Sequence, residues 1–115
     1  METVNFYKKM RRRIVRNFLD VLILAEMRTG PLSGYDVMTF VNDKFHFLVS
    51  PGTIYSILYS LERNGLITGA LVQRKRVYRL TDKGKATIRE VMKASDETRY
   101  LVSGLLKLKK EPLDR

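Results

Sequence analysis

The sequence predicts a mainly α fold with a small β-hairpin, namely a winged helix-turn-helix followed by a long C-terminal dimerisation helix. Three observations predict it: a short helix with both ends marked, a second helix just before it, and two strands with a basic turn just after it. At 115 residues the chain has the length of one domain. We divide it into a basic leader over 1–13, the winged helix-turn-helix over 14–81, the C-terminal helix over 82–110 and a tail over 111–115.

The central element is the helix predicted over residues 51–64. Ser50 is a favourable N-cap because its hydroxyl can accept a hydrogen bond from the first turn, and Pro51 follows where a missing N–H costs nothing. Gly65 supplies the left-handed residue that often ends a helix. One face is apolar and consists of Ile54, Ile57, Leu58 and Leu61. The opposite face carries two aromatic rings, a cation and small polar groups: Gly52, Tyr55, Ser56, Tyr59 and Arg63.

Two further helices are expected before this one. A broad apolar stripe predicts the first over about 14–28, and the breaker run 29–32 ends it. Ser33 then caps a second helix over about 34–44. A helix, a short link and a capped helix with a polar outer face are the pattern of a helix-turn-helix.

A β-hairpin is expected after the central helix. Its strands are predicted over 66–72 and 76–80, with a turn near Gln73-Arg74-Lys75 that lacks an Asn-Gly or Asp-Gly pair, so its type stays open. Arg74, Lys75 and Arg76 place three cations together, which suits a wing over a sugar-phosphate backbone. A simply solvated turn is the alternative.

The C-terminal helix is expected to pair two copies of the chain. Thr81 is a suitable N-cap, and no proline interrupts residues 85–110, although Gly104 is a candidate break. A helix of about 26 residues would be about 39 Å long, more than a small winged domain covers. Its apolar stripe therefore predicts coiled-coil-like pairing, with folding back over its own domain as the alternative. The expected dimer contacts, with help from the first helix, are Phe18, Leu22, Val91, Ala94, Thr98, Leu101, Val102, Leu105 and Leu108.

The composition favours a polyanionic partner. The chain has 22 Lys+Arg against 12 Asp+Glu, a formal net charge of +10 with the single His neutral. Five of these cations lie in the leader, which is either an arm or helix start that contacts phosphates or a solvated terminus: Lys8, Lys9, Arg11, Arg12 and Arg13.

Enzymatic and cofactor chemistry is not expected. Without cysteine there is no disulfide and no Cys-ligated zinc, and His46 lies alone between Phe45 and Phe47, as a linker residue rather than a ligand or a base. No Gly-rich phosphate loop or nucleophile elbow occurs. Polar residues interrupt the apolar run 21–25 on its N-terminal side, and no run reaches the roughly 20 apolar residues of a membrane span, so we expect a cytoplasmic protein.

The tyrosines divide into two groups. Tyr35 and Tyr78 alternate with core positions, so we expect both to pack. Tyr55 and Tyr59 stand on the outer face of the central helix, where a hydroxyl serves a ligand better than a core.

Four segments of the chain together resemble the PadR family of transcriptional regulators. They are Gly34-Tyr35-Asp36, Ser50-Pro51-Gly52-Thr53-Ile54-Tyr55, Leu61-Glu62-Arg63-Asn64-Gly65-Leu66-Ile67 and Val77-Tyr78-Arg79-Leu80-Thr81-Asp82-Lys83-Gly84, and the likeness covers about residues 14–92. The resemblance implies a winged-helix domain, a homodimer formed through the first and last helices, and binding to a palindromic operator, usually as a repressor. The single last helix resembles the short subclass, and the wing is shorter than is common in the family. No Trp lies in the last helix for the ligand stacking that some relatives use, so a small-molecule effector is left open without support.

We therefore expect a dimer that presents two copies of the helix 51–64 to successive major grooves of double-stranded DNA. Tyr55, Ser56, Tyr59 and Arg63 are the candidates for base edges or phosphates, and for Arg63 guanine and phosphate remain open. Gly52 and Thr53 can bring backbone amides and a hydroxyl to a phosphate at the helix start. Arg74, Lys75 and Arg76 would add affinity that does not depend on sequence.

Two other classes of function compete with this one. A winged-helix module that binds protein would be a monomer or a heteromer built on the last helix. A nonspecific nucleic-acid-binding protein would bind random duplex as tightly as any operator.

Overall fold

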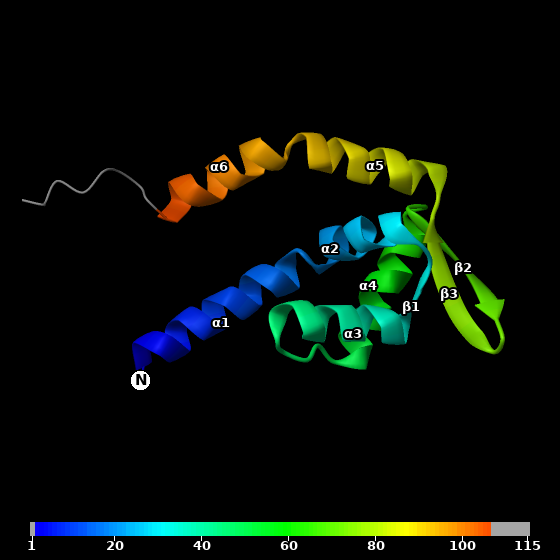
Figure 1. Cartoon of the computed structure of the whole chain (residues 1–115), viewed down its shortest axis with the longest axis horizontal. Coiled ribbons are helices and arrows are strands. Elements are labelled where there is room, and N and C mark those ends of the chain that lie inside the picture. The colour runs from blue at the N-terminus through cyan, green and yellow to red at the C-terminus, as the bar shows by residue number, and fades with distance from the viewer. Residues whose placement is uncertain (1, 107–115) are drawn as a thin grey trace, which may run out of the picture.

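The structure of the protein is a computed structural model that describes residues 2–106. Figure 1 shows the elements, which in chain order are α1 (Glu2–Asn17), α2 (Leu19–Glu26), the 3₁₀-helix η1 (Met27–Thr29), β1 (Leu32–Ser33), α3 (Gly34–Phe45), α4 (Pro51–Arg63), β2 (Ile67–Val72), β3 (Lys75–Leu80), α5 (Asp82–Lys93) and α6 (Ser95–Leu106). The three strands form one antiparallel sheet in the order β1-β3-β2. This arrangement confirms the predicted winged helix-turn-helix fold with a C-terminal helical extension.

One face of α4 packs into the hydrophobic core. Its fully buried side chains come from α2, α3, α4, β2 and α5: Leu19, Ile23, Val37, Val41, Ile54, Leu58, Ile67 and Ile88. On α4, Leu61 is also buried and Ile57 is half-buried, as the 3.6-residue spacing predicts. The opposite face of α4 is therefore left to solvent.

Three hydroxyls cap helices at the predicted positions. The Oγ of Ser33 accepts from Asp36 N at 3.1 Å, and the Oγ of Ser50 accepts from Thr53 N at 3.2 Å. The Oγ1 of Thr81 accepts from Gly84 N at 3.0 Å. Each bond satisfies an amide that has no partner within its own helix, so the starts of α3, α4 and α5 are fixed locally.

The wing is a hairpin with a two-residue turn. β2 and β3 pair from Ile67↔Leu80 to Val72↔Lys75, close to the predicted strands. Gln73 and Arg74 between them have φ values of 50° and 68°, the sign pattern of a type I′ turn, whose twist matches that of the strands. Neither residue is Gly or Asn, which is why the sequence did not reveal the turn type. The short strand β1, which pairs with β3, was not predicted either.

The N-terminal segment is helical from Glu2, so the predicted leader and the first predicted helix form one element with a break. The break lies at Phe18, where φ is −110° and ψ is 15°. The carboxylate of Asp20 accepts the N–H of Val21 at 2.8 Å, in place of the Asn17 carbonyl four residues back. A local side-chain bond of this kind competes with the helix ladder, and here it separates α1 from α2.

The predicted C-terminal helix is present but interrupted at Ala94, not at Gly104, which lies within α6. The hydroxyl of Thr98 donates to the Ala94 carbonyl at 2.9 Å, and the amide of Thr98 donates to the same oxygen at 2.9 Å. Back-bonding of a threonine often bends a helix, and this bond lies within one turn of the break. Residues 107–110 of the prediction lie outside the described residues.

The chain is elongated. Its principal extents are 63 × 34 × 21 Å, and its radius of gyration is 17.1 Å, against about 13 Å for a compact domain of this length. Figure 1 shows the free end of α1 and all of α6 extending away from the core, on the side opposite the wing. Val15 is the one buried residue of α1, and no described side chain of α6 is buried.

Candidate nucleic-acid interface

The solvent-facing side of α4 carries the side chains predicted for it. Tyr59 is 66% exposed and Tyr55 is 48% exposed, and Ser56 and Arg63 are also exposed. A Cβ atom placed on Gly52 would have no neighbouring heavy atom within 4 Å. The structure thus brings the four predicted side chains and Gly52 together on one accessible surface, which we call the α4 face.

The first turn of α4 has one unpaired amide. Pro51 has no N–H, Thr53 N donates to Ser50 Oγ, and Ile54 N donates to the Ser50 carbonyl at 3.1 Å. Among residues 2–106 the N–H of Gly52 has no acceptor. The hydroxyl of Thr53 is already engaged with that of Ser50 at 2.9 Å, so the Gly52 amide is the group that can receive an anion at the positive end of the helix.

Tyr55 and Tyr35 extend this surface to the start of α3. The ring of Tyr55 lies over Gly34, where an added Cβ would be 2.5 Å from its Cζ. Tyr35 is 69% exposed, so the prediction that it packs is wrong, whereas Tyr78 is buried as predicted. Val37 occupies the inner side of α3, and Tyr35, two residues earlier, lies about 200° around the helix from it. Tyr35 is thus an exposed aromatic residue beside the α4 face that the sequence reasoning missed.

Asp36 fixes the start of α3 by closing a capping box. Its Oδ2 accepts from Ser33 N at 2.9 Å, while Ser33 Oγ accepts from Asp36 N. The bond from the Ser33 amide lowers the pKa of Asp36 below its ordinary value, against the opposing effect of burial. The charged form of Asp36 therefore stabilises the helix that carries Tyr35.

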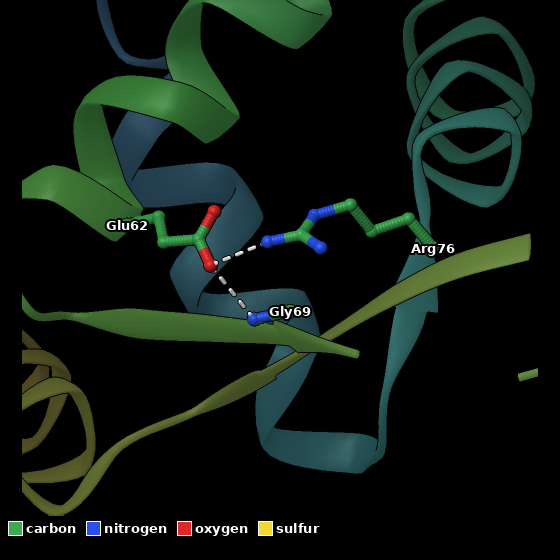
Figure 2. A network of polar contacts seen from close by, with 3 residues as sticks. All are labelled: Glu62, Gly69 and Arg76. Carbon is green, nitrogen blue, oxygen red and sulfur yellow. Dashed lines mark hydrogen bonds and ion pairs between the residues drawn. The ribbon is translucent and has the colours of Figure 1, made fainter. Parts of the chain in front are cut away.

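The three predicted wing cations have two different environments. Arg74 and Lys75 are exposed at the turn, and neither side chain has a hydrogen-bond or ion-pair partner among residues 2–106. Arg76 instead donates from Nη2 to Glu62 Oε2 at 2.9 Å, and its Cζ lies 5.5 Å from the centroid of the Tyr78 ring. Its partner Glu62 raises the pKa of Arg76 further above the ordinary range. Figure 2 shows that the same Glu62 oxygen also accepts from Gly69 N, at 3.0 Å.

The end of α4 is bound to the start of α5. Gly65 has a φ of 77°, and its carbonyl accepts from Thr81 Oγ1 at 2.6 Å. Thr81 N donates to the Leu66 carbonyl at 3.1 Å, and Lys83 Nζ donates to the Asn64 carbonyl at 2.9 Å. A Cβ on Gly84 would overlap that Leu66 oxygen, which explains a glycine at this position. We call this cluster the α4–α5 joint.

Two of the leader cations are bound within the protein. Arg11 Nη1 donates to the Phe45 carbonyl at 2.8 Å, and Arg12 lies 5.8 Å from the Phe47 ring centroid. They bind α1 to the end of α3 and to the link between α3 and α4. His46, in that link, is exposed and ends α3 with a φ of 62°. Lys8, Lys9 and Arg13 are exposed.

A second basic region lies away from the α4 face. A groove of about 580 Å³ between η1, β3 and α5 has Met27, Leu80, Ile88 and Met92 among its lining residues, together with four cations, Arg28, Arg79, Lys85 and Arg89. Because successive side chains of a strand point to opposite faces, Arg79 lies across the sheet from Arg76 and Tyr78. The basic side chains of residues 2–106 therefore lie on more than one surface, and only some of them surround α4.

The predicted dimer residues are largely accessible in the single chain. Leu22, Val91 and Ala94 are half-buried, and Phe18, Thr98, Leu101, Val102 and Leu105 are exposed. Leu108 lies outside the described residues. Tyr100, which was not predicted, is 83% exposed beside Leu101. Among residues 2–106 there is no cluster of metal-ligating side chains and no helix long and apolar enough to cross a membrane.

An exposed capped helix on a three-helix core, with a cationic hairpin beside it, defines a winged helix-turn-helix protein. Comparison with known families identifies which kind. Residues 23–90 match the transcriptional regulator PadR-like family, so the chain belongs to that family, whose members are regulators and not enzymes. A comparison with curated proteins found no match.

Solved structures of the same family share the fold. A PadR family transcriptional regulator from Eggerthella lenta is 25% identical, with a TM-score of 0.75 over 95% of this chain and 99% of that one. A PadR-like transcriptional regulator from Bacillus cereus is 26% identical, with a TM-score of 0.72 over 83% and 97%.

Another similar structure contains DNA. Bacillus subtilis PadR in complex with operator DNA is 32% identical, with a TM-score of 0.57 over 64% of this chain and 46% of that chain. The present chain thus matches less than half of that longer protein.

Proposed function

We propose that this chain is a sequence-specific DNA-binding transcriptional regulator that acts as a homodimeric repressor on a palindromic operator. In the proposed complex the helix 51–64 lies in the major groove and the wing 66–80 lies on the backbone. The observation that carries the proposal is the α4 face, which offers tyrosine hydroxyls, a cation and an unpaired amide beside the free cations of the wing. The similarity to Bacillus subtilis PadR, which was solved in complex with operator DNA, supports it.

The roles of the individual residues follow from their positions. Tyr55, Ser56, Tyr59 and Arg63 read base edges or neighbouring phosphates, since they project from the solvent side of α4. Gly52 brings its free amide to a phosphate, and Thr53 orients that turn through Ser50. Arg74 and Lys75 neutralise phosphates regardless of sequence. Arg76 differs from these two cations because its guanidinium is already hydrogen-bonded to Glu62.

Dimerisation is proposed because α6 and the start of α1 bury no side chain against the rest of residues 2–106. α6 has 12 residues, and a helix of this length is marginal in water without tertiary packing. It nevertheless exposes Tyr100, Leu101 and Leu105, while the start of α1 exposes Phe6 and Tyr7. A second copy that covers these side chains would give both helices the tertiary packing that they lack. The two copies of α4 would then face successive grooves of a palindromic site.

The proposal is tested by locating an operator and measuring the preference for it. Purified protein should protect a two-fold symmetric site in the DNA beside its own gene, and it should bind that duplex at least about 1,000-fold more tightly than random duplex at the same salt concentration. Tyr59→Ala should weaken operator binding more than random-duplex binding, and Tyr59→Phe isolates the contribution of the hydroxyl. Equal affinity for both duplexes would indicate a nonspecific nucleic-acid-binding protein.

Light scattering tests the oligomeric state separately. We expect a stable dimer, and Leu101→Glu together with Leu105→Glu should give a monomer with weakened operator binding. A monomeric wild-type protein would favour the protein-binding alternative. As a DNA-binding regulator, the protein is proposed to act in the cytoplasm.

A further inference from the structure

Glu62 lies where the recognition surface meets the wing. It is the penultimate residue of α4, and its side chain is 30% exposed and turned toward the hairpin. Its Oε2 accepts two hydrogen bonds, from Gly69 N on β2 at 3.0 Å and from Arg76 Nη2 on β3 at 2.9 Å. Figure 2 shows the carboxylate between the helix and the two strands. One oxygen atom of α4 therefore binds both strands of the wing.

We propose that Glu62 is a positioning residue for DNA binding, which fixes the angle between the wing and α4 without touching DNA. We call the contacts of Glu62 with Gly69 and Arg76 the brace. Arg76 then belongs to the brace and not to the set of phosphate contacts. The inference rests on the proposed function, because it assumes that α4 and the wing bind one duplex together. It gives Glu62, the one carboxylate within α4, a role in binding a polyanion.

The surroundings of Arg76 favour the brace over a free cation. Its guanidinium lies 5.5 Å from the ring centroid of Tyr78, which is buried in the core. Gly69 is the cross-strand partner of Tyr78, and a Cβ on Gly69 would be 2.8 Å from Arg76 Nε. The glycine thus provides the space in which Arg76 reaches Glu62, and the Tyr78 ring attracts the nearby guanidinium.

Small rotations of the hairpin have large effects at its tip. The tip at Gln73 is four residues from Gly69, about 13 Å along an extended strand. A rotation of about 10° would move Arg74 and Lys75 by about 2 Å, and a hydrogen bond to phosphate does not survive a displacement of that size. An anchor at Gly69 and Arg76 is therefore well placed to decide whether both surfaces reach DNA at once.

The direction in which Glu62→Gln changes DNA affinity distinguishes the brace from the alternative that Arg76 binds a phosphate. If Arg76 binds phosphate, Glu62 competes with DNA for it, and Glu62→Gln should tighten binding by removing a negative charge near the polyanion. If Glu62 positions the wing, Glu62→Gln should weaken operator binding about tenfold, the loss expected for one charged contact. Arg76→Gln should weaken it similarly without changing the salt dependence, and the double variant should bind no more weakly than the weaker single variant.

The matched control is Glu90→Gln. Glu90 on α5 is paired with Lys93 at 3.4 Å in an exposed i,i+3 pair, so the substitution removes the same charge from a salt bridge elsewhere. It should leave affinity unchanged. Gly69→Ala perturbs the brace without a charge change and should also weaken binding. Tighter binding by Glu62→Gln, or a salt dependence reduced by about one phosphate in Arg76→Gln, would overturn the proposal.

A measurement without DNA distinguishes failure of the brace from failure of the proposed function. Because the chain has no cysteine, spin labels can be attached at Ser60→Cys on α4 and Gln73→Cys at the wing tip. Glu62→Gln should broaden the distance distribution between the labels, and Glu90→Gln should not. An unchanged distribution refutes the brace even if operator binding is confirmed, whereas a broadened one with no operator preference in the wild type refutes only the proposed function.

Discussion

Gly52→Ala is expected to leave the fold intact and to weaken operator binding about tenfold or more. Gly52 lies in the first turn of α4, where an added methyl group would meet no atom of the described protein within 4 Å. The substitution therefore creates no internal clash. Alanine is the better helix former by up to about 1 kcal/mol in a helix interior and by less at an end. The free energy of unfolding should rise slightly or stay the same.

The loss of affinity follows from the free amide of Gly52. A phosphate bound at that N–H would be close enough for a new methyl group to displace it. A hydrogen bond to a charged group contributes about 1.5–3 kcal/mol, which corresponds to a loss of about 10- to 150-fold in affinity.

Fluorescence anisotropy with the operator and urea unfolding, on the same protein samples, check both halves of the prediction. Ser60→Ala is the control, because it raises the helix propensity of α4 at an exposed position outside the α4 face. If Gly52→Ala binds the operator as tightly as the wild type, the start of α4 does not approach a phosphate, and the proposed orientation of this helix is wrong.

Three further predictions concern the wing, the α4–α5 joint and the start of α3. Lys75→Ala should weaken binding to every duplex alike and lower the slope of log affinity against log salt by about one unit; a loss confined to the operator would mean that Lys75 reads bases. Gly84→Ala should destabilise the protein by about 3 kcal/mol or more, because the methyl group overlaps the Leu66 carbonyl and disrupts the hydrogen bonds around it; urea unfolding within about 1 kcal/mol of the wild type would contradict this. Since the folded-state pKa of Asp36 is lowered, its contribution to stability is complete above the unfolded pKa of about 3.9 and is lost as the pH falls through the lower folded value, so Asp36→Asn should be less stable than the wild type at pH 6 and should approach it at low pH.

The features predicted correctly from the sequence are those written in short segments. Ser50 and Thr81 cap their own helices three residues ahead, and Ile54, Leu58 and Leu61 define a buried face by spacing alone. The exposed face of α4 follows from that buried one. These local signals were enough to identify the helix-turn-helix and the hairpin.

The features that were missed depend on side chains acting at particular places. At the breaks near Phe18 and Ala94, Asp20 and Thr98 make local side-chain hydrogen bonds to the backbone, which hydrophobic periodicity cannot reveal. The ion pair of Arg76 with Glu62 joins residues 14 positions apart on different elements. The sequence therefore could not show that Arg76 is paired while Arg74 and Lys75 are not. The DNA contacts proposed for the α4 face and the wing stay predictions.

The α4–α5 joint has a consequence for the spacing of operator half-sites. Because the joint fixes α4 to α5, the bend at Ala94 sets the direction of each recognition helix relative to α6, where the two copies are proposed to pair. The 12 residues of α5 span about 18 Å. A change of about 10° at Ala94 would shift the far end of α5 by about 3 Å, close to the rise of about 3.4 Å per base pair. In the proposed dimer, the bend at Ala94, which the Thr98 hydroxyl contacts through the Ala94 carbonyl, would therefore set the number of base pairs tolerated between half-sites.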